Sequence, residues 1–248
     1  MDLKLLKKIC ETPGAPGFEN KIRKLVINEI SSHVQELSTD NMGNLIALIK
    51  GKESKSIMAS AHLDEIGFIV THIDNNGFIH FHTLGGFDPK TLTAQRVIIH
   101  GKKDIMGVMG SKPIHIMNAE EKTKAPKIND YFIDTGLSSD EVNEYIEIGN
   151  PITRERNLIT MGENINCKSL DNRISVYILI EAIKKIKDPP YDFYAVFSVQ
   201  EEVGIRGAQV AAHQINPDFG LGIDTTIAFD VPGAKDEEMV TKLGEGVA

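Results

Sequence analysis

A series of short strands without an intervening helix, in the middle of the chain, constrains the fold more than any other feature of the sequence. Apolar and β-branched residues predict strands over 68–73, 78–83, 96–100 and 105–108, and Asn75-Asn76-Gly77 predicts a hairpin turn between the first two. The stretches before and after this series alternate predicted helices with predicted strands. A chain in which a series of strands interrupts alternating helices and strands is predicted to fold as an α/β domain into which a β-rich domain is inserted.

The predicted elements on either side of the strand series follow α/β order. The run at 193–199 is apolar at nearly every position, which is typical of a central strand that is covered on both faces. Near the end of the β-rich stretch, Ser138 and Glu141 predict a capping box at the start of a short helix. Outside that stretch we predict helices over 2–11, 18–30, 174–186 and 208–213, and strands over 45–49, 57–61, 193–199 and 219–223.

Charge and cysteine content exclude several classes of function. The 248 residues include 27 Lys and Arg against 35 Asp and Glu, which gives 27 − 35 = −8. Counterion release would then oppose binding to a nucleic-acid backbone, so no nucleic-acid partner is expected. Cys10 and Cys167 are too few for a disulfide scaffold and favour a reduced, cytoplasmic location. The sequence shows neither a secretory signal nor an apolar stretch of ~18 residues, so no membrane partner is expected either.

Three of the predicted strands of the α/β part end in a histidine or in acidic residues. His62 and Asp64 follow one strand, and residues i and i+2 of an extended segment share a face. The carboxylate can therefore fix the imidazole tautomer while the other ring nitrogen binds a metal. Glu201 and Glu202 follow the central strand, and Asp224 follows the last one. Open α/β sheets place their sites beyond the carboxyl ends of their strands, so these side chains are expected to converge.

Each cluster also has a simpler interpretation when it is taken alone. His62 with Asp64 would be a surface pair, Glu201 with Glu202 a solvated acidic pair, and Asp171 the N-terminal cap of the helix that follows it. Taken together, one histidine and several carboxylates predict a site for zinc, cobalt or manganese, and a bridging carboxylate could hold two such divalent ions. Two ions can hold a hydroxide and polarise a carbonyl, while an unligated carboxylate takes the proton from water.

These motifs, in this order, resemble those of the dinuclear metalloaminopeptidases, a family that includes tetrahedral and glutamyl aminopeptidases and members labelled endoglucanase M. The resemblance covers nearly the whole chain. The motif at residues 200–208 is highly specific, whereas the His62 and Asp64 motif is shared with other peptidases of the same clan. The remaining matching segments are residues 15–19, 40–44, 61–65, 170–173 and 224–233.

The resemblance implies a role for each candidate site residue. Glu201 would be the general base, and Asp64 would orient His62. Asp171 would bridge two divalent metal ions. The ligands of the first ion would be His62, Asp171 and Asp224, and the ligands of the second would be Asp171 and Glu202.

The same resemblance implies how the chain is divided. Residues 1–67 and 158–248 would form an α/β metallopeptidase domain with a mixed central sheet flanked by helices. Residues 68–157 would form an inserted, β-barrel-like dimerisation domain. A homo-oligomer is therefore expected, either a dimer or a larger assembly built from dimers.

The chain departs from the family on its C-terminal side. Family members continue through further strands and helices, in which a histidine completes the second metal site, whereas no histidine follows Asp224 here. We therefore expect a C-terminally truncated member of the family. Its second ion would have only carboxylate ligands, so it would bind weakly or need a donor from outside the chain, and the activity of the chain alone would be impaired.

Three hypotheses of function are compatible with these residues. The first is a metal-dependent aminopeptidase that removes N-terminal residues from peptides, with a water that two metals activate and Glu201 deprotonates. The second is a non-catalytic, dimerising scaffold that binds one metal; the absent histidine favours it and the intact Glu201 opposes it. The third is a glycoside hydrolase, which needs only two suitably spaced carboxyl groups and leaves the histidine and the other acids unexplained.

Overall fold

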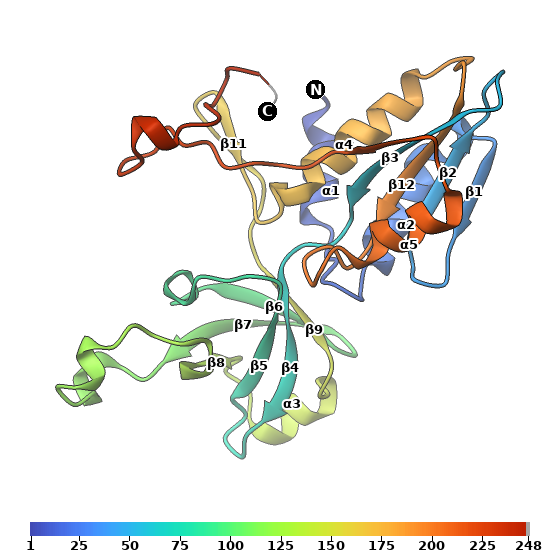
Figure 1. The fold of residues 1–248 in the computed structure, drawn as a ribbon. Helices are drawn as coiled ribbons and strands as arrows, with labels where there is room; N and C mark the ends of the chain where they lie inside the picture. The colour runs from blue at the N-terminus through green and yellow to red at the C-terminus, as the bar shows by residue number, and fades with distance from the viewer. Residues whose placement is uncertain (247–248) are drawn as a thin grey trace.

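The computed structural model describes residues 1–246 and shows a fold in two parts, an α/β part and a closed barrel (Figure 1). The barrel lies below the α/β part in Figure 1, on the side on which β3 ends. In chain order the barrel falls between β3 and α4, so the α/β part is built from both ends of the chain. The predicted fold class, an α/β fold with an inserted β-rich part, is confirmed.

The α/β part is organised around a five-stranded sheet with the order β1-β2-β12-β3-β13. The sheet is mixed, because β2 pairs antiparallel with β1 and β12, whereas β3 pairs in parallel with β12 and β13. Its strands are β1 (Glu36–Thr39), β2 (Leu45–Ile49), β3 (Ser56–His62), β12 (Asp192–Ser198) and β13 (Phe219–Gly222). Its helices are α1 (Leu3–Glu11), α2 (Asn20–Ile30), α4 (Leu170–Lys185) and α5 (Arg206–Ile215).

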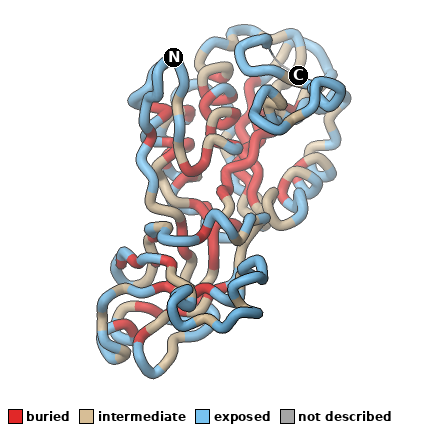
Figure 2. Tube along the Cα trace, turned by 90° about the vertical axis from the view of Figure 1, so that its left-hand side faces the viewer, coloured by how far each residue is buried: buried red, intermediate tan, exposed pale blue. Residues whose placement is uncertain are grey.

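Helices cover both faces of this sheet. Residues of α1, α2 and α4 pack on one face against Phe197 of β12, and Ala211 of α5 packs on the other face against Val196. Consecutive strand residues point to opposite faces, which is why these two neighbours belong to different hydrophobic clusters. Both are fully buried, in agreement with a central strand that is covered on both sides. Figure 2 shows that buried residues gather in the interior of the α/β part.

The barrel has its own hydrophobic core. Phe68 is fully buried there, with its ring 4.3 Å from that of Phe87 and 5.0 Å from that of Phe81. On β7 the side chains of Ile105 and Met109 point inward, as the period of two of a half-buried strand requires. The barrel strands are β4 (Gly67–Ile73), β5 (Ile79–Leu84), β6 (Arg96–His100), β7 (Asp104–Ser111), β8 (Tyr131–Asp134) and β9 (Pro151–Arg154), and α3 (Ser139–Tyr145) packs beside them.

Most of the predicted elements form, with small shifts at their ends, and the capping box of Ser138 and Glu141 precedes α3. The sequence patterns missed β1, β8, β9 and the hairpin of β10 (Ile159–Met161) and β11 (Asn164–Asn166). These strands are short, and β1, β10 and β11 are largely exposed, so they lack the apolar pattern that identifies a buried strand. The predicted strand at 219–223 forms as β13, an edge strand that is exposed along its whole length.

The barrel strands run from Gly67 to Arg154. The division at 68–157 into a peptidase domain and a dimerisation domain stays a prediction. None of the helices formed by residues 1–246 has the length and apolar character that a membrane crossing requires.

Candidate active site

The predicted site residues meet at the carboxyl ends of neighbouring parallel strands. His62 is the last residue of β3 and is in register with Ser198, the last residue of β12. Gly222, the last residue of β13, is in register with Ser60 on the other side of β3. Because the three strands run in the same direction, the residues that follow them leave the sheet at one edge. Those residues include Asp64, Glu201, Glu202 and Asp224.

His62 lies at the centre of this group, and its side chain is buried. Its Nε2 atom is 3.3 Å from Oδ1 of Asp171, 3.7 Å from Oε2 of Glu201 and 3.9 Å from Oδ1 of Asp224. Asp171 comes from the first turn of α4, so four segments that are far apart in the sequence supply the group. The side chains of Asp171 and Asp224 are half-exposed or more, which leaves the group open to solvent.

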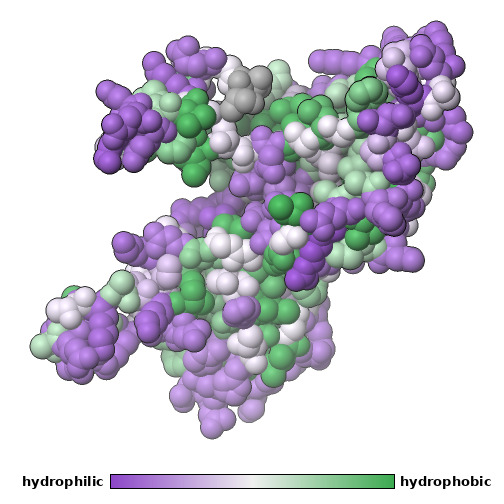
Figure 3. Space-filling view, viewed as in Figure 1, coloured by the Kyte–Doolittle hydropathy of each residue, from purple (hydrophilic) through white to green (hydrophobic). Residues whose placement is uncertain are grey.

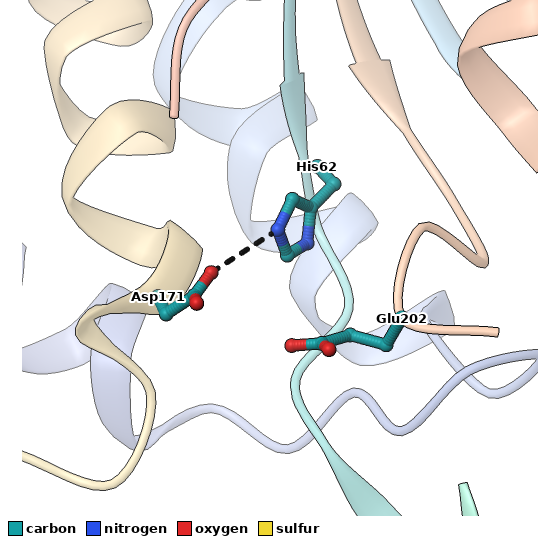
Figure 4. Close-up of side chains that lie close together, drawn as sticks. All are labelled: His62, Asp171 and Glu202. Atoms are coloured by element: carbon teal, nitrogen blue, oxygen red, sulfur yellow. Dashed lines mark ion pairs between the residues drawn. The ribbon is translucent and has the colours of Figure 1, made fainter. Parts of the chain in front are cut away.

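Three of these side chains can offer ligand atoms to one metal ion. The donor atoms of His62, Asp171 and Glu202 all lie within 4.8 Å of one another. In Figure 4, Asp171 and Glu202 approach the His62 ring from α4 and from the loop after β12. One imidazole nitrogen with carboxylate oxygens is a donor set that suits zinc, cobalt or manganese. Asp224 lies outside this tightest group, although it is close to His62.

Asp64 contacts both halves of the site. The Nδ1 atom of His62 is 3.1 Å from the backbone carbonyl oxygen of Asp64 and 3.5 Å from its carboxylate, so the carbonyl is the nearer partner. The carboxylate of Asp64 accepts hydrogen bonds from the backbone N–H groups of Glu201, at 3.1 Å, and Glu202, at 3.0 Å. Asp64 thus holds the two glutamates beside His62, a contact that the sequence did not predict.

The negative charges around His62 favour a positive charge at this site. Burial alone would lower the pKa of His62, but contacts with Asp171 and Asp64 and the charge of Asp224 outweigh burial and raise this pKa to about 10. In return, the contact with His62 lowers the pKa of Asp171. The cluster therefore stabilises positive charge at the position where its donor atoms converge.

The two adjacent glutamates are less acidic than exposed carboxyl groups. Burial raises the pKa of Glu202 to about 7, and the negative charge of Asp171 adds to the effect. Burial also raises the pKa of Glu201, against the opposing charge of His62. A carboxylate with a raised pKa is a better proton acceptor, and mutual repulsion among the acids favours a bound cation.

Buried polar side chains fix the start of the loop that carries Glu201 and Glu202. The carboxylate of Glu19 accepts a hydrogen bond from the backbone N–H of Gln200. Oδ1 of Asn44 accepts the N–H of Val199 at 3.0 Å, and its Nδ2 donates to the carbonyl of Gly207 at 2.9 Å. A Cβ atom at Gly207 would lie 2.3 Å from Asn44, so only glycine allows this approach. Glu19 and Asn44 lie in motifs of the resemblance, but no sequence pattern predicted a role for either residue.

The anchoring function of Asn44 predicts a large effect on stability. Asn44→Ala leaves the N–H of Val199 and the carbonyl of Gly207 without their side-chain partner in a fully buried position. We expect the free energy of unfolding to fall by about 2–4 kcal/mol, measured by urea denaturation. Asn143→Ala, which removes exposed hydrogen bonds from α3, is the matched control and should change it by less than about 1 kcal/mol. An equally small change for Asn44→Ala would contradict the anchoring role.

Comparison with known proteins shows the family to which the chain belongs. The family model of M42 glutamyl aminopeptidases matches residues 43–248. A lysyl aminopeptidase of Pyrococcus furiosus is 38% identical over 99% of this chain and 72% of the relative. A TET aminopeptidase from the archaeon Thaumarchaeota SCGC AB-539-E09 superposes with a TM-score of 0.95 and 36% identity, over 98% of this chain and 70% of that one.

A third similar protein is the TET1 peptidase of Pyrococcus horikoshii, with a TM-score of 0.83 and 31% identity over 92% of this chain and 72% of that one. The family match, the sequence alignment and the superpositions all involve most of the chain. The chain therefore belongs to the M42 glutamyl aminopeptidase family.

Proposed function

We propose that the chain is a metal-dependent aminopeptidase that hydrolyses the N-terminal residue from peptides, with Glu201 as the general base. One observation carries this proposal more than any other. The Glu201 carboxylate is 3.7 Å from Nε2 of His62, next to the group of His62, Asp171 and Glu202, but it is not one of the three side chains that offer atoms to a common ion. Asp224 also lies outside this group, and it is the family resemblance that implies a ligand role for Asp224 and a proton-acceptor role for Glu201.

We propose that this donor set binds two divalent ions. His62, Asp171 and Asp224 would hold one ion, and Asp171 and Glu202 would hold the second, because Asp171 lies near both His62 and Glu202. When bound, such ions would polarise the carbonyl of the substrate and lower the pKa of the attacking water. Zinc and cobalt suit this nitrogen and oxygen donor set, and manganese is compatible with it.

The side chains of the chain then provide proton transfer and alignment. Glu201 would accept a proton from the attacking water and donate it to the amine that leaves when the peptide bond breaks. Its pKa, which burial raises, suits both steps better than that of an exposed carboxylate. Asp64 would hold Glu201 in place through the backbone N–H, so its role would be that of a positioning residue.

Metal removal tests the proposal directly. Dialysis against a chelator is expected to abolish hydrolysis of aminoacyl nitroanilides, and added zinc or cobalt is expected to restore it, because the acidic cluster alone cannot polarise a carbonyl. Elemental analysis after incubation with excess zinc or cobalt should find two ions per chain. Full activity after complete metal removal would contradict the proposal.

The same measurements test the alternative hypothesis, a non-catalytic scaffold that binds one metal. One ion or none per chain, together with no hydrolysis, would support a non-catalytic scaffold. The presence of Glu201 beside the metal-binding group supports the enzyme, since a scaffold has no use for a proton acceptor there.

The barrel supports a proposal about assembly. The TET1 peptidase of Pyrococcus horikoshii can assemble into a tetrahedron or a large octahedral shell. In this chain, apolar residues gather on the barrel face that Figure 3 turns to the viewer, and Met106 and Val108 of β7 and Ile114 and Ile116 beyond it are exposed. Exposed apolar patches mark interaction surfaces, so we expect a homo-oligomer built through the barrel. A monomeric mass by light scattering would contradict this.

A further inference from the structure

A buried group of charged side chains lies next to the candidate site and takes no part in the chemistry described above. Glu65 and Arg173 are fully buried and Lys168 is 7% exposed. Nζ of Lys168 forms an ion pair with Oε1 of Glu65, and the Arg173 guanidinium lies 3.8 Å from the same oxygen. Removing charges from water is unfavourable, so a buried ion pair is weak evidence for stability and calls for another reason.

The position of this group in the sequence suggests that reason. Glu65 follows Asp64 directly and lies three residues after His62. Lys168 lies three residues before Asp171, and Arg173 lies two residues after it. The ion pair therefore joins the segment that leaves β3 with His62 to the segment that begins α4 with Asp171.

Glu65 and Arg173 both bind backbone groups at the end of α1 and in the loop that follows it. Arg173 donates hydrogen bonds to the carbonyl oxygens of Ile9, at 2.6 Å, and Thr12, at 2.8 Å, at the end of α1. The backbone N–H of Glu65 donates to the carbonyl of Gly14, 3.0 Å away in the loop that follows α1. Gly14 also makes room for the guanidinium, because a Cβ atom there would lie 2.8 Å from Arg173. The end of α1 and its loop thus restrain the positions of both Glu65 and Arg173.

The position of Asp171 depends on such restraints more than the position of His62 does. His62 belongs to a strand and its side chain is 2% exposed, whereas the side chain of Asp171 is 65% exposed and lies in a non-helical first turn of α4. Few contacts of its own fix this carboxylate. The ion pair of Lys168 with Glu65 and the hydrogen bonds of Arg173 restrain the backbone on both sides of it.

We propose that the buried pair of Glu65 and Lys168 is a positioning device, which holds Asp171 at the distance from His62 that a shared metal ion requires. The inference rests on the proposed metal site and adds residues that set its affinity. Neither Glu65 nor Lys168 touches the ion or the substrate. Mutation of a residue that orients a metal ligand without touching the ion typically changes metal affinity by about 10- to 100-fold.

A double-mutant cycle on metal affinity tests the proposal. The variants are Glu65→Gln, Lys168→Met and the double variant, and the readouts are the dissociation constant of Co²⁺, by competition with a chromophoric chelator, and its visible absorption spectrum. Each single variant should bind Co²⁺ about 10-fold more weakly, with an altered spectrum. The double variant should be no weaker than either single one, since the two residues act as a unit.

Lys184→Met is the matched control. Lys184 lies in the last turn of α4, at the opposite end of the helix from Asp171, and pairs with Glu29 at 3.3 Å and Glu181 at 3.2 Å. Its replacement therefore removes an ion pair from α4 without touching the site. Its Co²⁺ affinity should equal that of the unsubstituted chain. If a single variant fails to fold because it leaves a buried charge unpaired, the double variant, which removes both charges of the pair, provides the result.

The outcomes separate this inference from the proposed function. A double variant that binds Co²⁺ within twofold of the unsubstituted chain, with the same spectrum, would show that the pair is only structural. A double variant whose loss of binding free energy equals the sum of the two single losses would show that Glu65 and Lys168 do not act as a unit. If the unsubstituted chain binds no Co²⁺, the proposed metal site itself is wrong, and the inference is wrong with it.

Discussion

Replacement of Glu201 by glutamine, Glu201→Gln, is expected to lower kcat by about 10²–10⁴-fold and to leave the metal content unchanged. Glutamine has the size of glutamate but cannot accept a proton, so the attacking water keeps its proton. The metal content should survive, because Glu201 lies outside the group of side chains that offer atoms to a common ion. Steady-state hydrolysis of aminoacyl nitroanilides and elemental analysis of the same sample measure the two quantities.

Glu163→Gln is the matched control for this variant. Glu163 is exposed in the turn between β10 and β11, so the same chemical change there should alter neither kcat nor the metal content. If Glu201→Gln retained the wild-type kcat, Glu201 would not be the general base. If it lost its metal, Glu201 would be a ligand, and the assignment of the two adjacent glutamates would have to be reversed.

Replacement of Asp171 by asparagine, Asp171→Asn, is expected to have the second large effect, on metal binding itself. Asp171 is 3.3 Å from His62 and belongs to the same donor group as Glu202, so the loss of its charge should weaken both of the proposed ion sites. We expect metal affinity to fall by more than about 100-fold, because even residues that only orient a ligand change it by up to that amount. Activity should fall below detection at micromolar metal.

Asp140→Asn provides the comparison for Asp171→Asn. Asp140 lies in the first turn of α3, as Asp171 lies in the first turn of α4, but it belongs to the barrel. Isothermal titration with zinc should therefore give the wild-type result for Asp140→Asn. Wild-type zinc affinity in Asp171→Asn would show that Asp171 does not bridge the two proposed ions.

The part of the site that the sequence predicts is the part that depends on sheet geometry. His62, Glu201 and Asp224 each follow an apolar run, and apolar runs of that length are recognisable as strands. Once β3, β12 and β13 are taken as neighbouring parallel strands, their carboxyl ends must meet. Asp171 follows no strand, and only the family resemblance distinguished it from an ordinary helix cap.

The parts that the sequence did not predict depend on contacts between distant segments. Asp64 accepts two backbone N–H groups of a loop that lies 137 and 138 residues further along the chain, and no local pattern encodes such a contact. The ion pair of Glu65 and Lys168 spans 103 residues and is buried, whereas a lysine and a glutamate in a sequence normally indicate solvent. Short, exposed strands such as β1 and β10 were not predicted for a related reason, because only burial produces the apolar pattern by which a strand is recognised.

The most direct test of the account is the position of bound metal. In a crystal soaked with zinc, anomalous diffraction should show one ion about 2.0–2.2 Å from Nε2 of His62 and from a carboxylate oxygen of Asp171, and a second ion between Asp171 and Glu202. Such density would confirm that side chains from distant segments form one metal centre. Zinc bound only elsewhere, with none between His62 and Asp171, would contradict the account.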